Sequence, residues 1–321
     1  MGKIAFIFPG QGAQYVGMGR DMAENFDVAR RVFAQADEIL KMKLTDTVFY
    51  GSEEDLKLTE VTQPAIVTTS VACLEVLRQH GVAAEGVAGL SLGEYSALIA
   101  AGSLLYADVL PIVQKRGRFM QEAVPPGIGG MAAILGLARD KVLEACRLAS
   151  AEGVVEPANY NSPDQIVVAG EVAAIRRACD IAKELGAKRT VELPVSVSFH
   201  CSLLRSVEPL LQQELERISI TKAELPVVAN ISADYIDEPG QICNALVRQV
   251  SHAVMWQDSV ETLIRDGFDT FVEVGPGKSL TGLMKKINPN VWVHQVEDVR
   301  TLEKVLAVLG SEEGGQHAVG R

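Results

Sequence analysis

The sequence lacks several features that define specialised classes of protein. It is short of positive charge, and its net charge of −11 excludes a general nucleic-acid binder, which needs a basic face. No apolar run is long enough to cross a membrane. Its five cysteines have no CxxC spacing, and such an odd, dispersed count fits a reducing compartment. The opening MGKIAFIFPG has too short an apolar run for a signal peptide, so we expect a cytoplasmic location.

What is present is the composition of a globular protein, with 48% hydrophobic residues in a chain that can bury one large core or two unequal ones. Short apolar runs such as KIAFIF (3–8) and GVAGL (86–90) alternate with helical patterns. The helical patterns lie at 17–43, 63–80, from 93, 108–124, 240–249 and from 259. Strands that alternate with helices at this spacing predict a doubly wound parallel sheet, an α/β fold.

A second pattern interrupts the first after two prolines, at 125–126. It contains a strand, a helix, two strands separated by the turn NSPD, a helix and a last strand over 188–197. This βαββαβ order is that of the ferredoxin-like unit. We therefore predict a discontinuous large α/β domain, a small inserted ferredoxin-like domain, and a tail without periodicity that is disordered. The boundaries are 1–125 and 198–310 for the large domain, 126–197 for the small one and 311–321 for the tail.

The segment GVAGLSLGEYSAL (86–98) carries a candidate nucleophile. It has the pattern Gly-x-Ser-x-Gly between a predicted strand and a predicted helix, with Gly89 and Gly93 around Ser91. In an α/β-hydrolase-like core, such a tight turn holds the serine hydroxyl at the carboxyl edge of the sheet. The amide of Leu92, at the start of the helix, then points toward an oxyanion. A serine that only caps the helix would have the same spacing.

A serine nucleophile needs a base, and the chain offers several histidines. His200 follows the last strand of the small domain, where it can face the cleft between the domains. An ordinary α/β-hydrolase runs serine, acid, histidine, which would favour Asp269 and His294 instead. The sequence alone leaves both alternatives open. The five histidines are His80, His200, His252, His294 and His317.

One helix carries a charge on a face that is otherwise apolar. Ile112, Arg116 and Met120 recur at helical spacing, and Gly117 admits a close neighbour. For an ordinary helix, such an arginine extends its guanidinium to water or forms a surface salt bridge.

Several separate motifs, in the same order, resemble those of the malonyl-CoA:acyl carrier protein transacylases of fatty-acid and polyketide synthesis. The resemblance covers nearly all of the chain up to about residue 310. One departure is Leu90, where the family most often has histidine, at a position with no catalytic role. The motifs are FPGQG (8–12), GLSLGEYSA (89–97), QKRGRFMQ (114–121), ANYNSPDQIVVAG (158–170), SFHCSLL (198–204), LVRQV (246–250) and EVGPGKSLTGL (273–283).

The resemblance implies roles for individual residues. It implies that Ser91 and His200 form a catalytic dyad, with the imidazole oriented by the main-chain carbonyl of Gln249. The amides of Gln11 and Leu92 are the implied oxyanion hole.

The resemblance also implies a substrate site. The guanidinium of Arg116 binds the free carboxylate of a malonyl group through two parallel hydrogen bonds. Phe199 matches the malonyl-selective form of the family, since relatives that select methylmalonyl commonly have a smaller residue there. The implied substrate-binding residues are Arg116, Gln249, Phe199, Met120 and Asn161.

The implied reaction is a ping-pong transfer of malonyl from malonyl-CoA to the phosphopantetheine thiol of acyl carrier protein, through a malonyl-serine ester. It supplies extender units for fatty-acid or polyketide synthesis. We expect a monomer that needs no cofactor and no metal, and binds neither nucleic acid nor membrane. A serine hydrolase that releases malonate, and a non-catalytic relative that only binds the carrier protein, are the alternatives.

Family carrier proteins are acidic, whereas this chain is itself acidic, so docking needs a local basic patch. The candidate residues are Lys183, Lys188, Arg189, Lys285 and Lys286.

Overall fold

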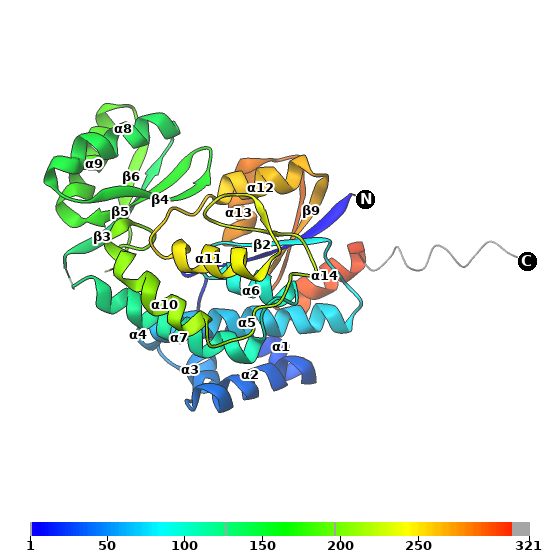
Figure 1. Ribbon diagram of the computed structural model, residues 1–321. Helices are drawn as coiled ribbons and strands as arrows, with labels where there is room; N and C mark the ends of the chain where they lie inside the picture. Colours follow the sequence, from blue (N-terminus) through cyan, green and yellow to red (C-terminus); the bar gives the residue numbers. More distant parts are fainter. Residues whose placement is uncertain (1, 126, 196, 310–321) are drawn as a thin grey trace, which may run out of the picture.

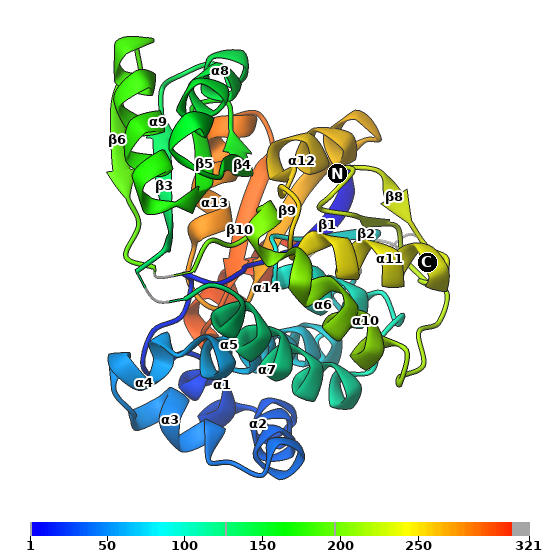
Figure 2. The ribbon, with the colours of Figure 1, turned by 60° about the vertical axis from the view of Figure 1, so that its left-hand side comes forward.

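The computed structural model describes residues 2–125, 127–195 and 197–309, and within them the chain forms two sheets with helices around each (Figures 1 and 2). The predicted tail, 311–321, lies outside the described residues. No helix in the described ranges is both long and apolar enough to cross a lipid bilayer.

The larger sheet has the strand order β10-β9-β1-β2-β7-β8 in the described part of the chain. Neighbouring strands are parallel except for β8, which is antiparallel to β7. The predicted α/β sheet is confirmed, with β8 as the exception, because the connection from β7 is too short for the crossover that a parallel strand requires. The strands are β1 (Lys3–Phe8), β2 (Gly86–Gly89), β7 (Val227–Val228), β8 (Tyr235–Ile236), β9 (Phe268–Val274) and β10 (Trp292–Val296).

Helices cover both faces of this sheet, which explains the continuous apolar run of β1. Phe6 and Phe8 face a core that includes α5 and α6, while Ala5 and Ile7 face α12 and α13. The helices of the larger unit are α1 (Arg20–Asn25), α2 (Asp27–Leu40), α3 (Leu44–Tyr50), α4 (Glu53–Lys57), α5 (Thr59–Gln79), α6 (Gly93–Ala100), α7 (Tyr106–Ala123), η2 (Ser202–Val207), α10 (Glu208–Leu215), α11 (Pro239–Gln249), α12 (Trp256–Arg265), α13 (Ser279–Ile287) and α14 (Val299–Leu309).

Two predicted helices have different bounds in the structure. The pattern at 17–43 is two helices, because Phe26 is extended (φ −127°, ψ 121°) and packs its ring against His80 at 5.5 Å between centroids. The helix predicted from Gln63 begins at Thr59, so Pro64 lies inside it rather than in its first residues.

The smaller sheet has the order β4-β5-β3-β6, with every neighbouring pair antiparallel. This order confirms the ferredoxin-like unit. Its last strand ends at Glu192, earlier than predicted, and the division of the chain into two domains at the stated boundaries stays a prediction. The elements are β3 (Gly129–Leu135), α8 (Arg139–Ala149), η1 (Ser150–Glu152), β4 (Val155–Ser162), β5 (Gln165–Glu171), α9 (Val172–Glu184) and β6 (Arg189–Glu192).

The two faces of the smaller sheet have different neighbours. One face is covered by α8 and α9. On the other, Met131, Val167 and Ala169 pack around Cys201, next to Phe199. The sheet therefore supports the segment that contains His200.

Candidate active site

Ser91 occupies a strained turn between β2 and α6. Its φ is +53°, in the left-handed region that most side chains avoid. The flanking glycines are required by packing: a Cβ on Gly89 would lie 2.0 Å from the carbonyl carbon of Gly93, and one on Gly93 would lie 2.0 Å from the main-chain oxygen of Phe8. The Gly-x-Ser-x-Gly spacing is therefore the geometric condition for β2 and α6 to meet at this angle.

The structure brings Ser91 and His200 together from distant parts of the sequence. Ser91 Oγ lies 2.6 Å from His200 Nε2. On the other side of the ring, His200 Nδ1–H donates to the main-chain oxygen of Gln249 at 2.7 Å. This second bond sets the tautomer and leaves Nε2 as the acceptor for the serine proton.

The electrostatic surroundings keep His200 neutral. Burial, together with the nearby charge of Arg116, lowers the pKa of His200 to about 3, although its hydrogen bond to Gln249 acts in the opposite direction. At neutral pH the imidazole is therefore free to accept a proton, as a general base must be.

Two side chains that the sequence analysis did not single out hold the turn around Ser91. Asn230 Oδ1 accepts from the main-chain N–H of Ser91 at 2.6 Å, and its Nδ2 donates to the main-chain oxygen of Gly89 at 2.6 Å. Glu94, in the first turn of α6, is fully buried and accepts from Gln249 Nε2 at 2.5 Å. Asn230 lies two residues after the short buried strand β7, and this position was a signal that could have identified it.

The two predicted oxyanion donors have free amides. In the ranges that the structure describes, the main-chain N–H groups of Gln11 and Leu92 form no hydrogen bond. The loop of Gln11 lies directly on the nucleophile turn, since a Cβ on Gly10 would be 2.4 Å from the main-chain oxygen of Leu90. Unpaired amides at a serine turn suit a developing oxyanion, and this role stays a prediction.

Arg116, on α7, lies inside the protein and not at its surface. Its side chain is 1% exposed, so the alternatives of an arginine extended to water or a surface salt bridge are wrong. Its guanidinium donates to Gln63 Oε1 and to Gln249 Oε1, each at 2.9 Å, while Nε is buried with no partner among the described residues. Burial lowers the pKa of Arg116, although nearby Tyr95 and Glu94 raise it. Neutral acceptors engage two of its five N–H groups, and the remaining donors suit a carboxylate.

The remaining predicted substrate residues lie in different surroundings. Met120 is buried on α7, with its Sδ 3.9 Å from Gln63 Nε2. Phe199 is half-buried between the large core and the small sheet. Asn161 Oδ1 is buried without a partner in the described part of the chain, and no hydrogen bond there connects it to the dyad. Their contact with substrate stays a prediction.

The alternative triad is not assembled. His294 lies on β10, at the sheet edge, and β9 and β1 separate it from β2. Asp269 is near the start of β9 and accepts from the main-chain N–H of Gly2 at 2.9 Å. Because active sites of such sheets lie at the carboxyl ends of strands, neither group can serve Ser91.

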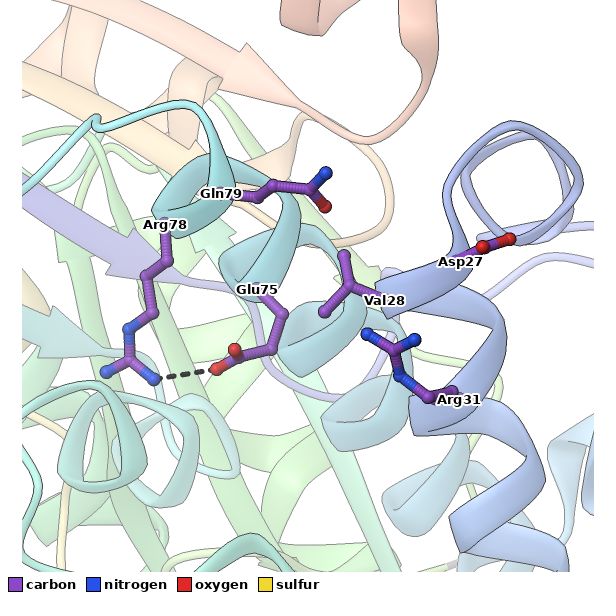
Figure 3. A pocket seen from close by; sticks show the side chains of 6 residues that line it. All are labelled: Asp27, Val28, Arg31, Glu75, Arg78 and Gln79. Carbon is purple, nitrogen blue, oxygen red and sulfur yellow. Dashed lines mark hydrogen bonds and ion pairs between the residues drawn. The ribbon is translucent and has the colours of Figure 1, made fainter.

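A groove of about 570 Å³ between α2 and α5 is separate from this site (Figure 3). It contains the ion pair of Arg78 with Glu75, at 2.7 Å. None of the predicted site residues lines it, so it contributes nothing to the chemistry of Ser91. The lining residues are Asp27, Val28, Arg31, Glu75, Arg78 and Gln79.

Comparison with known proteins shows the family to which the chain belongs. The acyl transferase domain family matches residues 5–303. The malonyl CoA-acyl carrier protein transacylase of Bacillus subtilis (strain 168) is 44% identical over 97% of this chain and 99% of its own. The crystal structure of the transacylase of that name from Clostridium perfringens superposes with a TM-score of 0.94, at 46% identity over 97% of this chain and 98% of its own. A further structure shows a type II PKS acyl-carrier protein in complex with its malonyl-transacylase, with a TM-score of 0.93 at 40% identity, over 95% of this chain and 99% of the other.

The chain belongs to the acyl transferase domain family and, within it, to the branch of the malonyl CoA-acyl carrier protein transacylases.

Proposed function

We propose that the chain transfers a malonyl group from malonyl-CoA to the phosphopantetheine thiol of acyl carrier protein, for fatty-acid or type II polyketide synthesis, through an ester on Ser91. The family and the named relatives support the overall transfer. The observation that supports the covalent route is the 2.6 Å contact of Ser91 Oγ with the neutral imidazole of His200.

The first half-reaction loads the enzyme. His200 Nε2 takes the proton of Ser91 Oγ as this oxygen attacks the thioester carbon of malonyl-CoA. The oxyanion that forms accepts hydrogen bonds from the amides of Gln11 and Leu92. The carbon–sulfur bond then breaks, the CoA sulfur receives the proton from His200, and a malonyl ester remains on Ser91.

The second half-reaction unloads it through the same groups. His200 takes the proton of the phosphopantetheine thiol as the sulfur attacks the ester carbon. The carbon–oxygen bond breaks, and Ser91 Oγ recovers its proton from His200. The free enzyme is restored, and no cofactor or metal enters either step.

Arg116 selects the acyl group. Its buried guanidinium binds the malonyl carboxylate through paired hydrogen bonds, whereas an acetyl group would leave the cation without an anionic partner. The free-energy cost of an unpaired buried cation applies only to a substrate that lacks the carboxylate. Arg116 therefore discriminates between malonyl and acetyl groups by charge rather than by size.

Three of the five candidate docking residues for the acidic carrier protein, Lys188, Arg189 and Lys286, lie near one end of the small sheet. The side chain of Lys188 packs against Gly136, whose N–H donates to the main-chain oxygen of Asp164 at 2.8 Å. Asp164 in turn pairs with Lys286 of the larger unit at 3.5 Å. Arg189, next to Lys188, is exposed. A basic surface that spans both units suits an acidic partner, and we propose that the carrier protein binds there. We propose further that the enzyme is a cytoplasmic monomer.

Separate replacement of two histidines tests the assignment of the base. His200→Ala should lose malonyl transfer by about 10²-fold or more, as expected when a general base is removed. His294→Ala should retain transfer, because His294 lies across the sheet from Ser91. The measurement is the rate of malonyl transfer to carrier protein, and loss of activity in the His294 variant alone would refute the proposed dyad.

A further inference from the structure

The buried carboxyl group of Glu94 takes no part in the reaction described above. Glu94 follows the nucleophile by three residues in the chain, and its side chain is 0% exposed. Burial raises the pKa of Glu94 to about 7, although hydrogen bonds from Gln249 and Asn230 and the charge of Arg116 lower it. Burial of a carboxyl group costs free energy unless it is hydrogen-bonded, so the hydrogen-bond partners of Glu94 indicate its role.

Glu94 accepts hydrogen bonds at both of its oxygens. Gln249 Nε2 donates to Oε2 at 2.5 Å, and the main-chain N–H of Asn230 donates to Oε1 at 3.4 Å. The same Nε2 group also donates to the main-chain oxygen of Ser91 at 2.9 Å. With these acceptors on one side, the amide nitrogen of Gln249 faces Glu94 and its oxygen faces Arg116.

The opposite orientation of the Gln249 amide would place like groups together at both ends. The amide oxygen would face the Glu94 carboxylate, and the NH₂ group would face a guanidinium, which has only donors. Both mismatches would be buried, where unsatisfied polar groups are most costly. Glu94, together with the main-chain oxygen of Ser91, therefore determines which end of Gln249 is presented to Arg116.

We propose that Glu94 is a positioning residue for substrate selection, which acts through the Gln249 side chain to hold Arg116 where its guanidinium meets the malonyl carboxylate. This inference rests on the proposed function, because it concerns the discrimination that Arg116 provides. Glu94 touches neither the substrate nor the reacting atoms, so its effect is on the preference for malonyl over acetyl groups.

The test is the rate at which Ser91 is acylated by malonyl-CoA and by acetyl-CoA, measured in single turnovers. The two donors share CoA, so the ratio of their rates isolates the acyl group. Glu94→Gln exchanges one acceptor for a donor and cannot satisfy both Gln249 and Asn230. We expect the malonyl-to-acetyl ratio to fall about tenfold or more, the size expected for a lost hydrogen bond to a charged group.

Glu273→Gln is the matched control. Glu273, on β9, is also fully buried and accepts from the amides of Leu280 and Thr281 at 3.0 and 2.7 Å, in no contact with Arg116 or Gln249. It loses a buried carboxylate to the same extent, and its ratio should equal that of the unaltered protein. If both variants lowered the ratio equally, the effect would be one of general stability and the proposal would be overturned.

A double-variant cycle tests whether the effect passes through Arg116. Arg116→Ala should itself lower the ratio, and Glu94→Gln added to it should lower it no further. An additional fall would overturn the positioning role while leaving the proposed function intact. An Arg116→Ala variant with an unchanged ratio would instead contradict the proposed function.

Gln249→Met keeps the proposal testable if Glu94→Gln does not fold. Methionine has nearly the same shape and retains the main-chain oxygen that orients His200, but it removes the side-chain connection between Glu94 and Arg116. The ratio should fall as in Glu94→Gln, and an unchanged ratio would overturn the proposal.

Discussion

At the scale of single residues, the site depends on charged groups that are buried without a full set of partners. Two of the five guanidinium N–H groups of Arg116 have amide acceptors, and its Nε has no partner among the described residues. Sequence patterns placed this arginine on an apolar helix face, but its burial and its partner Gln63 depend on how α5 packs against α7. The dyad needs contacts across more than a hundred residues. Glu94 lies within the motif GLSLGEYSA (89–97) and Asn230 shortly after a short strand, but neither position indicates what the side chain contacts. Their roles could not be inferred from spacing alone.

Loss of the Arg116 guanidinium tests the residue scale. Arg116→Ala should reduce kcat/KM for malonyl-CoA by about 30-fold or more, in line with about 2–5 kcal/mol for truncating one partner of a buried charged pair. Acetyl-CoA should improve relative to malonyl-CoA, since it no longer leaves a cation unpaired. Arg118→Ala, which removes an exposed arginine from the same helix, is the control. Equal effects of the two variants on malonyl-CoA would contradict the assignment.

At the scale of helices and strands, local sequence patterns predicted the structure best where only one backbone geometry is possible. The β2–α6 turn was predictable because only glycine fits at positions 89 and 93. The division of the segment 17–43 was not, since Phe26 leaves the helical conformation for a tertiary contact with His80. The antiparallel direction of β8 depends on the short connection from β7, and the periodicity of hydrophobic residues does not predict the length of that connection.

A glycine substitution tests the element scale. Gly93→Ala should lower the free energy of unfolding by about 1–3 kcal/mol, the usual cost of overpacking, because the added methyl group meets the Phe8 carbonyl. Malonyl transfer should fall with it as the turn of Ser91 shifts. Gly282→Ala, in α13, adds a methyl group to open space and should leave stability equal or higher. Denaturant unfolding measures both, and a stable, fully active Gly93→Ala variant would contradict the account.

At the scale of the whole molecule, the two units combine features that neither has alone. The small sheet supports the segment of His200 on one face, while the large sheet presents Ser91 at its carboxyl edge. The class of each sheet followed from the order of predicted strands and helices. The meeting of Lys188 and Lys286 near Asp164 did not, because their positions depend on how the two units pack.

Charge reversal tests the proposed docking surface. Lys188→Glu together with Arg189→Glu should raise the apparent KM for carrier protein and leave that for malonyl-CoA unchanged, because rim charges act mainly on association. The increase should shrink as salt is added. Lys41→Glu with Lys43→Glu, exposed at the turn between α2 and α3 on the far side of the molecule, is the control (Figure 1). Equal changes in both KM values would count against docking at this surface.

The central claim is that one hydroxyl group carries the malonyl group between two thiols. Mass spectrometry of the protein after mixing with isotopically labelled malonyl-CoA, and again after addition of carrier protein, tests it most directly. The account predicts a malonyl mass on the peptide that contains Ser91, followed by its loss from that peptide and its appearance on the carrier protein. A label that never forms on Ser91, or that is released as free malonate while the carrier protein stays unlabelled, would contradict it.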